Sequence, residues 1–286
     1  MTGAPQPPAD ALTVARALAW AQTQGLDRLD AQLLLGHLLQ QGRGWLIAHD
    51  DHPLPADTAL AFAEGCRRRA AGEPLAYVLG EREFHGIKLQ VSPAVLVPRP
   101  DTETLVDWAL ELLPTLATAQ PRVIDLGTGS GAIALAVAHR HPAASVLATD
   151  LSPDALAVAR ANAMRLGLPV AFAEGAWWAA VPADARYELV LSNPPYIAGD
   201  DAHLPALRHE PLMALTPGGD GLGALRQIVA SAPAHLAPGG WLLLEHGWDQ
   251  AETVAALLRD AGFKQITTRD DIESRPRCTG GCWRGP

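Results

Sequence analysis

Beyond Pro121, short apolar runs alternate with helical patterns, and this order constrains the fold more than any other feature. VIDL and VLATD are separated by a predicted helix from about Gly131 to His139, and another helix follows over about Asp154 to Leu166. Such alternation is typical of a parallel sheet with helices on both faces. VAFAE, ELVLSN, GWLLLEHG, KQITTR and a segment near Cys278 complete the predicted strands. Because no long helix separates the last two, we expect them to form an antiparallel hairpin at one edge.

The first part of the chain has the pattern of a small helical bundle. Helices are predicted over about 11–24, 29–41 and 57–71, and residues 1–9 read as a short disordered tail. Gly25, Gly42 and Gly72 stand where C-terminal caps are expected. We therefore predict a helical domain over residues 1–73.

At Pro74 the helical pattern gives way to alternating apolar and polar residues, which indicates a connection between two domains. The sequence EREFHGIKLQ alternates apolar and polar residues around His85-Gly86, which predicts a hairpin, and Pro93, Pro98 and Pro100 then interrupt it. We interpret 74–100 as a β-hairpin linker and 101–286 as the α/β domain. Asp101-Thr102 is expected to cap a helix that runs to about Leu113.

Composition excludes several classes of protein. The chain has 286 residues and is 48% hydrophobic, which is enough for a substantial core and too much for a disordered protein. Its formal charge of −9 does not fit a protein that binds duplex nucleic acid. Arg67-Arg68-Arg69 is interpreted as the solvated end of a helix. The N-terminus shows no signal core, and no apolar run is long enough to span a membrane, so a cytoplasmic protein is expected. The three cysteines are expected to be reduced thiols, and no metal site is predicted.

The first predicted strand leads into a glycine-rich turn, in the sequence Asp125-Leu126-Gly127-Thr128-Gly129-Ser130-Gly131. Glycines at this point let the backbone turn sharply and approach a ligand closely. Two ligand classes use such a turn, dinucleotides and S-adenosylmethionine, and GTGSGA also satisfies the loose dinucleotide pattern. The glycines alone therefore leave both ligands open.

Two carboxylates favour S-adenosylmethionine. Asp125 precedes the turn, where an anionic pyrophosphate would disfavour it and a cationic ammonium or sulfonium would suit it. Asp150 ends the second strand, at a position suited to accepting hydrogen bonds from two ribose hydroxyls. Each could instead be a turn or N-cap residue. Together, at the ends of adjacent strands, they indicate a ligand site.

The fourth strand ends in LSNPPYIAG, from Leu191 to Gly199, where proline must stop the strand. The Asn193 oxygen and the Pro194 carbonyl can accept both hydrogens of a planar amide or amine. Pro194 and Pro195 stiffen the turn, and Tyr196 offers a flat face. An amide nitrogen held in line with a methyl sulfonium would react as if intramolecularly, without a strong base. A rigid structural turn is the alternative.

These residues resemble the release-factor glutamine N5-methyltransferases, which modify the glutamine of the Gly-Gly-Gln motif in peptide chain release factors. The resemblance covers nearly the whole chain. NPPY is shared with methyltransferases that act on adenine or guanine, whereas VPRPDTE and the helical N-terminal domain are more specific. The segments that carry the resemblance are GEPLAYVLGEREF (72–84), VSPAVLVPRPDTE (91–103), DLGTGSG (125–131), SNPPYI (192–197), HEPLMAL (209–215) and LLLEHG (242–247).

The resemblance implies a class I S-adenosylmethionine-dependent methyltransferase with a Rossmann-like seven-stranded sheet. It implies that Asn193, Pro194 and Tyr196 are catalytic, that Asn193–Tyr196 hold the glutamine amide, and that S-adenosylhomocysteine is the product. The implied cofactor contacts are Asp125, Gly127, Thr128, Gly129, Ser130, Gly131, Asp150, Trp177 and Asn193. Trp177 is chosen over Trp178 from spacing. The family has Asp before this tryptophan; here Ala176 stands there, so that contact is absent or supplied elsewhere.

The implied partners are release factors, in translation termination, with no membrane and no specific nucleic acid; we expect a monomer. The acidic balance fits a basic protein partner. The alternatives are a base-directed nucleic-acid methyltransferase, a noncatalytic cofactor-binding adaptor and a nicotinamide dehydrogenase. His209-Glu210 and Glu245-His246 are expected to brace a loop and pack a strand end rather than act as acid or base. Arg99 and Glu103 could contact cofactor, substrate or each other.

Overall fold

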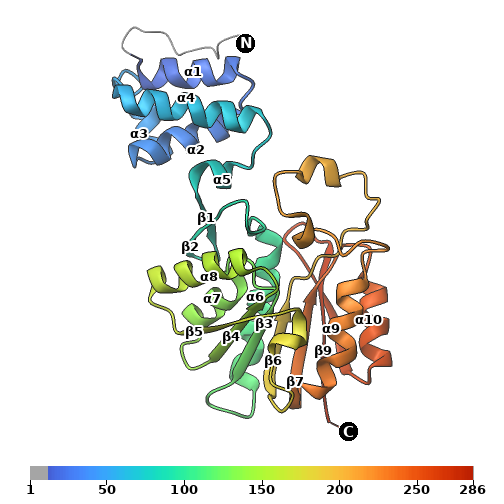
Figure 1. The fold of residues 1–286 in the computed structure, drawn as a ribbon. Helices are drawn as coiled ribbons and strands as arrows, with labels where there is room; N and C mark the ends of the chain where they lie inside the picture. The colour runs from blue at the N-terminus through green and yellow to red at the C-terminus, as the bar shows by residue number, and fades with distance from the viewer. Residues whose placement is uncertain (1–11, 286) are drawn as a thin grey trace. The chain divides into compact units, whose positions relative to one another are not determined.

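A computed structural model describes residues 12–285, and the predicted tail at 1–9 lies outside this range. The chain forms two compact units, the first ending at Glu81 and the second beginning at Arg82. This division falls inside the stretch 74–100 that we interpreted as a linker. Each unit has its own core. The colours of Figure 1 show which helices and strands belong to each stretch of the chain.

The first unit is a helical bundle around a core that includes Leu35, Leu46 and Phe62. Gly25 and Gly72 follow helices with positive φ, as predicted for C-terminal positions. Gly42 was wrongly expected to end a helix: it has φ −76° and begins a short helix that the sequence pattern did not predict. The left-handed cap before it is Gln40, at φ 54°. The helices are α1 (Val14–Thr23), α2 (Arg28–Leu39), α3 (Arg43–Ala48), α4 (Ala56–Ala70) and α5 (Leu75–Leu79).

The predicted hairpin forms as β1 (Glu81–Phe84) and β2 (Ile87–Gln90), which make a two-stranded sheet. His85 and Gly86 form its turn, both with positive φ. Beyond it, a 3₁₀ turn, η1 (Pro100–Thr102), leads into α6 (Glu103–Leu112). The predicted cap is corrected here: Thr102 occupies the N-cap position of α6 but makes no capping hydrogen bond. Its hydroxyl is engaged elsewhere, as described below.

The second unit contains the predicted sheet, seven-stranded and mostly parallel, in the order β5-β4-β3-β6-β7-β9-β8. The strand ELVLSN ends at Ser192, as the prolines required. β9 pairs antiparallel with both β7 and β8, so the predicted edge hairpin is confirmed. The strands are β3 (Arg122–Leu126), β4 (Ser145–Asp150), β5 (Val170–Glu174), β6 (Tyr187–Ser192), β7 (Leu236–Glu245), β8 (Lys264–Asp270) and β9 (Pro276–Cys282).

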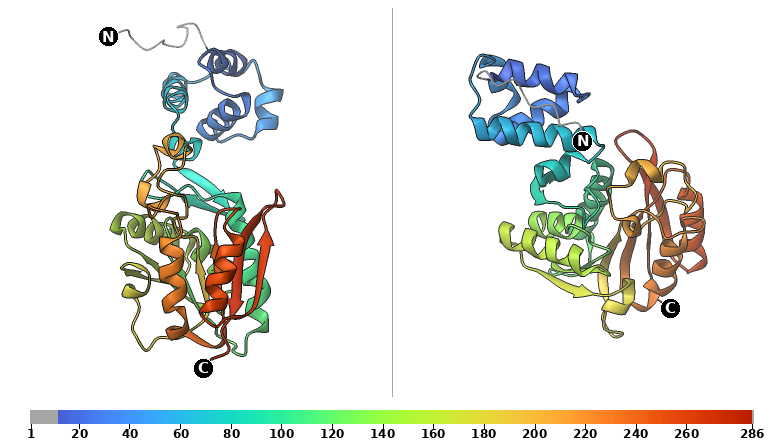
Figure 2. Two further views of the ribbon diagram at one scale, coloured as in Figure 1. Left: turned by 90° about the vertical axis from the view of Figure 1, so that its right-hand side faces the viewer. Right: turned by 45° about the horizontal axis from the view of Figure 1, so that its top comes forward.

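Helices cover both faces of this sheet (Figures 1 and 2). Successive strand residues point to opposite faces, so Val123 joins one core cluster and Ile124 the other. The helices that contribute to the first cluster are α6, α7 (Ala132–Arg140) and α8 (Pro153–Leu166); α9 (Gly223–Ser231) and α10 (Ala251–Asp260) contribute to the second. The shorter turns are η2 (Leu113–Thr115), η3 (Trp177–Ala180), η4 (Leu204–Leu207), η5 (Leu212–Ala214) and η6 (Ala232–Ala234).

The strand order places the chemistry-bearing loops side by side. β3 pairs with β4 on one side and with β6 on the other, so the order of strands reverses at β3. Ligands of open α/β sheets bind at the carboxyl ends of the strands beside such a reversal. The glycine loop leaves the end of β3 there, and NPPY leaves the end of β6.

Candidate active site

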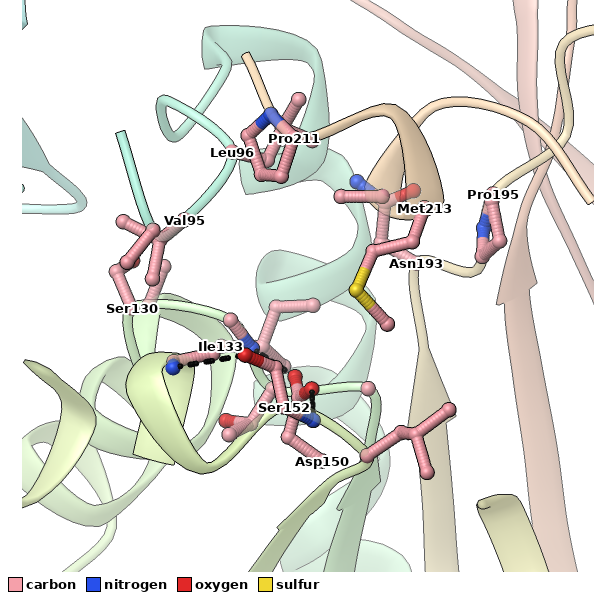
Figure 3. A pocket seen from close by; sticks show the side chains of 18 of the residues that line it. Val95, Leu96, Ser130, Ile133, Asp150, Ser152, Asn193, Pro195, Pro211 and Met213 are labelled. Carbon is pink, nitrogen blue, oxygen red and sulfur yellow. Dashed lines mark hydrogen bonds between the residues drawn. The ribbon is translucent and has the colours of Figure 1, made fainter. Parts of the chain in front are cut away.

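A cavity opens at the carboxyl ends of β3, β4 and β6, with about 1040 Å³ of empty space when its open side is included. This size suits a ligand of nucleoside dimensions. Four parts of the second unit line it: the segment before α6, the chain after β3 and β4, the turn after β5, and the β6–α9 connection. Figure 3 shows the residues Val95, Leu96, Ser130, Ile133, Asp150, Ser152, Asn193, Pro195, Pro211 and Met213 around it.

The glycine loop forms one wall of the cavity. Gly127, Gly129 and Gly131 all have positive φ, between 56° and 86°, which side chains rarely adopt. A Cβ on Gly131 would also lie 2.8 Å from Leu135 Cδ1. The Gly127 and Thr128 N–H groups donate to the Thr149 carbonyl at 2.9 and 2.8 Å, which fixes the loop against β4. The backbone of the loop is thus held open toward the cavity.

Asp125 lies beneath this loop and is fully buried, so it is not among the residues that line the cavity. Its Oδ2 accepts from the Thr128 hydroxyl at 2.6 Å and from the Ala134 N–H at 3.3 Å. Burial raises the pKa of Asp125 to about 7, although the hydrogen bonds from Thr128 and Ala134 oppose the rise. Asp125 therefore holds the glycine loop from below, and the predicted direct contact with a cationic ligand stays a prediction.

Asp150, the last residue of β4, lines the cavity directly. Its Oδ2 accepts from the Gly129 N–H at 2.8 Å, and its Oδ1 accepts from the Ser152 N–H at 2.9 Å. Each oxygen of a carboxylate can accept a second hydrogen bond, so both can still receive a hydroxyl from a ligand. Burial raises the pKa of Asp150, and these backbone hydrogen bonds counteract it.

The two adjacent tryptophans have different environments. Trp177 lines the cavity with its ring against Gly127, where a Cβ would lie 3.0 Å from the ring. Trp178 is buried, donates its Nε1–H to the Ile228 carbonyl at 3.0 Å, and stacks on His235. Of the two, Trp177 lines the cavity, and its contact with a cofactor stays a prediction. Ala176 also lines the cavity, so no carboxylate stands at that point.

The side-chain amide of Asn193 is hydrogen-bonded through its nitrogen only. Its Nδ2 donates to the Thr102 hydroxyl oxygen at 3.2 Å, which leaves its Oδ1 as the acceptor on the other side. Within residues 12–285, neither this Oδ1 nor the Pro194 carbonyl accepts a hydrogen bond. The two acceptors predicted for a planar amide are therefore available together, on a backbone that two prolines stiffen.

A second cavity adjoins the first and shares Leu96, Arg99, Asn193 and Ala214 with it. Pro194, Tyr196 and Glu245 line only this second cavity. Burial, followed by the nearby Glu245 carboxyl, raises the pKa of Tyr196, so its hydroxyl stays protonated and is a donor. The structure thus brings the predicted residues other than Asp125 and Gly131 to two adjoining compartments, with Asn193 lining both.

An ion pair joins two segments that line the cavities. Arg99 pairs with Glu210, whose other carboxylate oxygen accepts the Val97 N–H at 3.1 Å. The loop-bracing role predicted for Glu210 is confirmed by these contacts. Glu103 instead accepts the His85 N–H at 3.0 Å, so the two residues left open together have separate partners.

Sequence reasoning missed two residues that position the site. Asn162 donates to the Ser130 carbonyl and also bonds the backbone of Gln90, which ties the glycine loop to the end of β2. Thr102, expected to be a helix cap, holds Asn193 instead. An Asn inside an apolar helix face was a signal for the first; no sequence signal pointed to the second.

Further chemistry is limited in the part of the chain that the structure describes. Its cysteines, Cys66, Cys278 and Cys282, are buried free thiols. No group of three or more His, Cys, Asp or Glu side chains within residues 12–285 is arranged to hold a metal ion. Every helix described is too short or too polar to cross a membrane.

Comparison with known proteins gives matches to both units. Residues 10–80 match the PrmC N-terminal domain family, and residues 103–254 match the Methyltransferase small domain family. The release factor glutamine methyltransferase of Bordetella pertussis is 52% identical over 259 residues, which are 90% of this chain and 95% of that protein. The protein of the same name from Xylella fastidiosa strain Temecula1 is 50% identical over 268 residues, covering 93% and 96%.

A solved methyltransferase from Pyrococcus furiosus matches with a TM-score of 0.53 at 18% identity, covering 70% of this chain and 90% of that one. At that identity the likeness shows the fold alone. Together with the seven-stranded sheet, it confirms the predicted methyltransferase fold.

Proposed function

The chain belongs to the release factor glutamine methyltransferase family, and on that premise we propose that it transfers a methyl group from S-adenosylmethionine to the side-chain amide nitrogen of a glutamine. The acceptor is the glutamine of the Gly-Gly-Gln motif of peptide chain release factors. The observation that carries the proposal is the pair of adjoining cavities that share Asn193. One compartment suits the methyl donor and the other suits a flat amide.

The residues of the first cavity fit S-adenosylmethionine. Asp150 has free acceptor positions for ribose hydroxyls, and Trp177 offers a flat face for a purine. Apolar side chains, Ile133 and Leu151 among them, also line the cavity. The glycine loop carries no basic side chain that could neutralise a pyrophosphate. When bound, the cofactor supplies an electrophilic methyl carbon on a sulfonium. These features support it over a dinucleotide.

The second cavity fits a carboxamide. A glutamine amide presents two N–H groups, and the structure offers two unfilled acceptors, Asn193 Oδ1 and the Pro194 carbonyl. Tyr196 lines the same cavity and supplies a flat wall. Holding both N–H groups fixes the direction of the nitrogen lone pair, and orientation of this kind lowers the barrier to transfer. The proton released after transfer can pass to water.

The charge of the chain supports a protein partner. The net charge of −9 favours association with a basic protein and disfavours a bare nucleic acid. We propose that the helical unit ending at Glu81 contributes to release-factor recognition, and that the enzyme works as a cytoplasmic monomer in translation termination. The base-directed alternative is not favoured, because the relatives that match over most of the chain are named for release factors.

The decisive test is incubation of the protein with labelled S-adenosylmethionine and a purified release factor, followed by mass spectrometry of the Gly-Gly-Gln peptide. A gain of one methyl group on the glutamine is expected. A release factor in which this glutamine is replaced by alanine is the control and should stay unlabelled. Label on DNA or RNA, with none on the release factor, would overturn the proposal.

A further inference from the structure

The exposed apolar side chains of the second unit gather at one edge of its sheet. Strands β3 to β7 run parallel, so the segments that follow them lie at the carboxyl edge, where the cavities open. β8 has the same direction, because it and β7 both pair antiparallel with β9. Within residues 82–285, all but Met164 of the large apolar residues that are exposed follow a strand at this edge; they are Leu151, Leu212, Met213, Trp248 and Ile272.

Three of these residues are not covered by the ligands of the two cavities. Leu151 and Met213 line the first cavity (Met213 is labelled in Figure 3), so a bound cofactor can bury them. Leu212, Trp248 and Ile272 line neither cavity, although 64%, 63% and 87% of them are exposed. Large apolar side chains that gather around a site in this way are typical of a surface that another macromolecule covers.

The turn that carries Trp248 is hydrogen-bonded to the turn after β6. The Gln250 Nε2–H donates to the Tyr196 carbonyl at 2.9 Å, and the Gln250 Oε1 accepts the Gly247 N–H at 2.9 Å. The Gln250 N–H also donates to the Gly247 carbonyl at 2.9 Å, which closes the turn. Trp248 stands between Gly247 and Gln250, so its place is set by hydrogen bonds that reach a residue of the second cavity.

The turn that carries Leu212 is hydrogen-bonded to the same peptide group from its other side. The Leu215 N–H donates to the Leu212 carbonyl at 3.0 Å, and the Leu215 carbonyl accepts the Ile197 N–H at 3.0 Å. The Tyr196 carbonyl and the Ile197 N–H belong to one planar peptide group, in which these two bonds point in opposite directions. Because Tyr196 and Ile197 both line the second cavity, the two exposed apolar turns are attached to its wall.

We propose that Trp248 and Leu212 are docking residues for the folded surface of the release factor that surrounds its Gly-Gly-Gln segment. This inference rests on the proposed function, which places the glutamine amide in the second cavity. A glutamine that fills this cavity brings the surrounding protein surface over the two attached turns. Trp248 is the expected anchor, because a tryptophan buries a large apolar area in an interface at a low cost in conformational entropy.

The charges of the two flanking segments favour a basic protein as the occupant. Residues 198–215 and 246–250 carry the acidic side chains Asp200, Asp201, Glu210 and Asp249 against one arginine, Arg208. Acidic groups around an apolar anchor steer a partner of opposite charge toward it. The net charge of −9 opposes both a second copy of this chain and an anionic lipid surface at the same place.

The test measures methylation of a purified release factor by wild type, Trp248→Ala and Met164→Ala. Trp248→Ala should raise the KM for the release factor at least about tenfold and lower kcat less than about threefold, since the reacting groups are untouched. Met164→Ala is the matched control and should behave as wild type, because Met164 is 83% exposed on α8 and lies away from the carboxyl edge. A KM in Trp248→Ala within about twofold of wild type overturns the proposal, as does an equal rise in Met164→Ala.

A short Gly-Gly-Gln peptide separates docking from a distortion of the cavity. The peptide lacks the folded surface, so Trp248→Ala should lower kcat/KM for it by less than about threefold. Trp248→Phe should recover most of the affinity for the whole release factor, and Leu212→Ala should raise KM by a smaller factor than Trp248→Ala. A loss with the peptide as large as the loss with the whole release factor would place the defect in the cavity and overturn the docking role.

Binding without turnover distinguishes failure of this inference from failure of the proposed function. Calorimetry with S-adenosylhomocysteine present should give a release-factor Kd that is at least about tenfold weaker in Trp248→Ala. Methylation together with an unchanged Kd overturns the inference and leaves the function standing. A release factor that binds through Trp248 and is not methylated leaves the docking role standing and rejects the function. A wild-type dimer that dissociates in Trp248→Ala, seen by sedimentation, would make a second copy the occupant and overturn the proposal.

Discussion

At the scale of single residues, the site depends on which atoms are left without partners. Asn193 gives its N–H to Thr102 and keeps its oxygen free, and the Pro194 carbonyl is free beside it within the described chain. Each oxygen of Asp150 accepts a backbone N–H, from Gly129 and Ser152, and faces the cavity as a possible acceptor. In each of these residues, hydrogen bonds within the protein hold the side chain in place, and the remaining acceptors are left for a ligand.

Asn193→Ala removes one of the two acceptors for the glutamine amide. We expect kcat to fall by at least about a hundredfold, because the nitrogen is no longer oriented toward the methyl carbon. The cofactor Kd should change little, since the lost contacts are to the substrate. Single-turnover kinetics with calorimetry measures both, and a methylation rate near wild type would refute the role given to Asn193.

Asp150→Ala removes the carboxylate that faces the first cavity. Cofactor binding should weaken by about 1–3 kcal/mol, from the loss of charge-assisted hydrogen bonds. Asp150→Asn is the matched control: it keeps the shape and one acceptor, and an intermediate loss is expected. Calorimetric titration with S-adenosylhomocysteine measures the three constants, and equal values would exclude Asp150 from the site.

At the scale of elements, the glycine loop shows how sterics and function coincide. Gly131 has φ 86°, is the N-cap residue of α7, and has no room for a Cβ beside Leu135. Its freedom from a side chain lets the loop turn from β3 into the helix while the backbone stays open to the cavity. Asp125 and Asn162 then hold the loop from within the protein.

Gly131→Ala should destabilise the fold more than a left-handed conformation alone would explain. The left-handed conformation of an alanine at this position costs about 1–2 kcal/mol of folding free energy. The overlap of its Cβ with Leu135 costs a further ~1–3 kcal/mol. Gly167→Ala is the control, because Gly167 has φ 65° but a Cβ added there would meet no atom within 4 Å. Urea unfolding compares the two, and equal losses would show that Leu135 moves aside freely.

The elements that sequence predicted well are those set by local chemistry. Pro194 and Pro195 had to end β6 at or before Asn193, and the glycines after Leu126 had to open a turn. The helix α3 was missed because RGWLIA is shorter than two turns and shows no clear period. The role of Thr102 was missed because capping is a local property, whereas its partner Asn193 lies far away in the sequence. Long-range partners of this kind are not encoded in any local pattern.

At the scale of the whole molecule, two buried carboxyls stand out against the acidic balance of the chain. Asp125 and Glu245 are both buried, and burial raises each pKa to about 7. The sequence pattern predicted that both residues lie near strand ends. It could not show that both side chains would be buried. Their burial makes the free energy of unfolding depend on pH in a direction opposite to that of a salt-bridged carboxylate.

Asp125→Asn tests this dependence. The folded protein keeps Asp125 protonated to about pH 7, whereas in the unfolded chain it ionises near pH 4. The unfolded state therefore binds fewer protons at this residue between these values, and the contribution of Asp125 to the free energy of unfolding falls as pH rises from about 4 to about 7. The free energy of unfolding of wild type relative to Asp125→Asn should thus decrease over this window, by about 2–4 kcal/mol. A difference that is constant with pH would contradict a raised pKa.

The most direct test of the central claim is a crystal structure of the protein with S-adenosylhomocysteine and a Gly-Gly-Gln peptide. The account predicts the glutamine amide in the second cavity, one N–H on Asn193 Oδ1, the other on the Pro194 carbonyl, and its nitrogen directed at the sulfur. An Asn193 oxygen turned away from the sulfur, with no space between them for a side-chain amide, would contradict it.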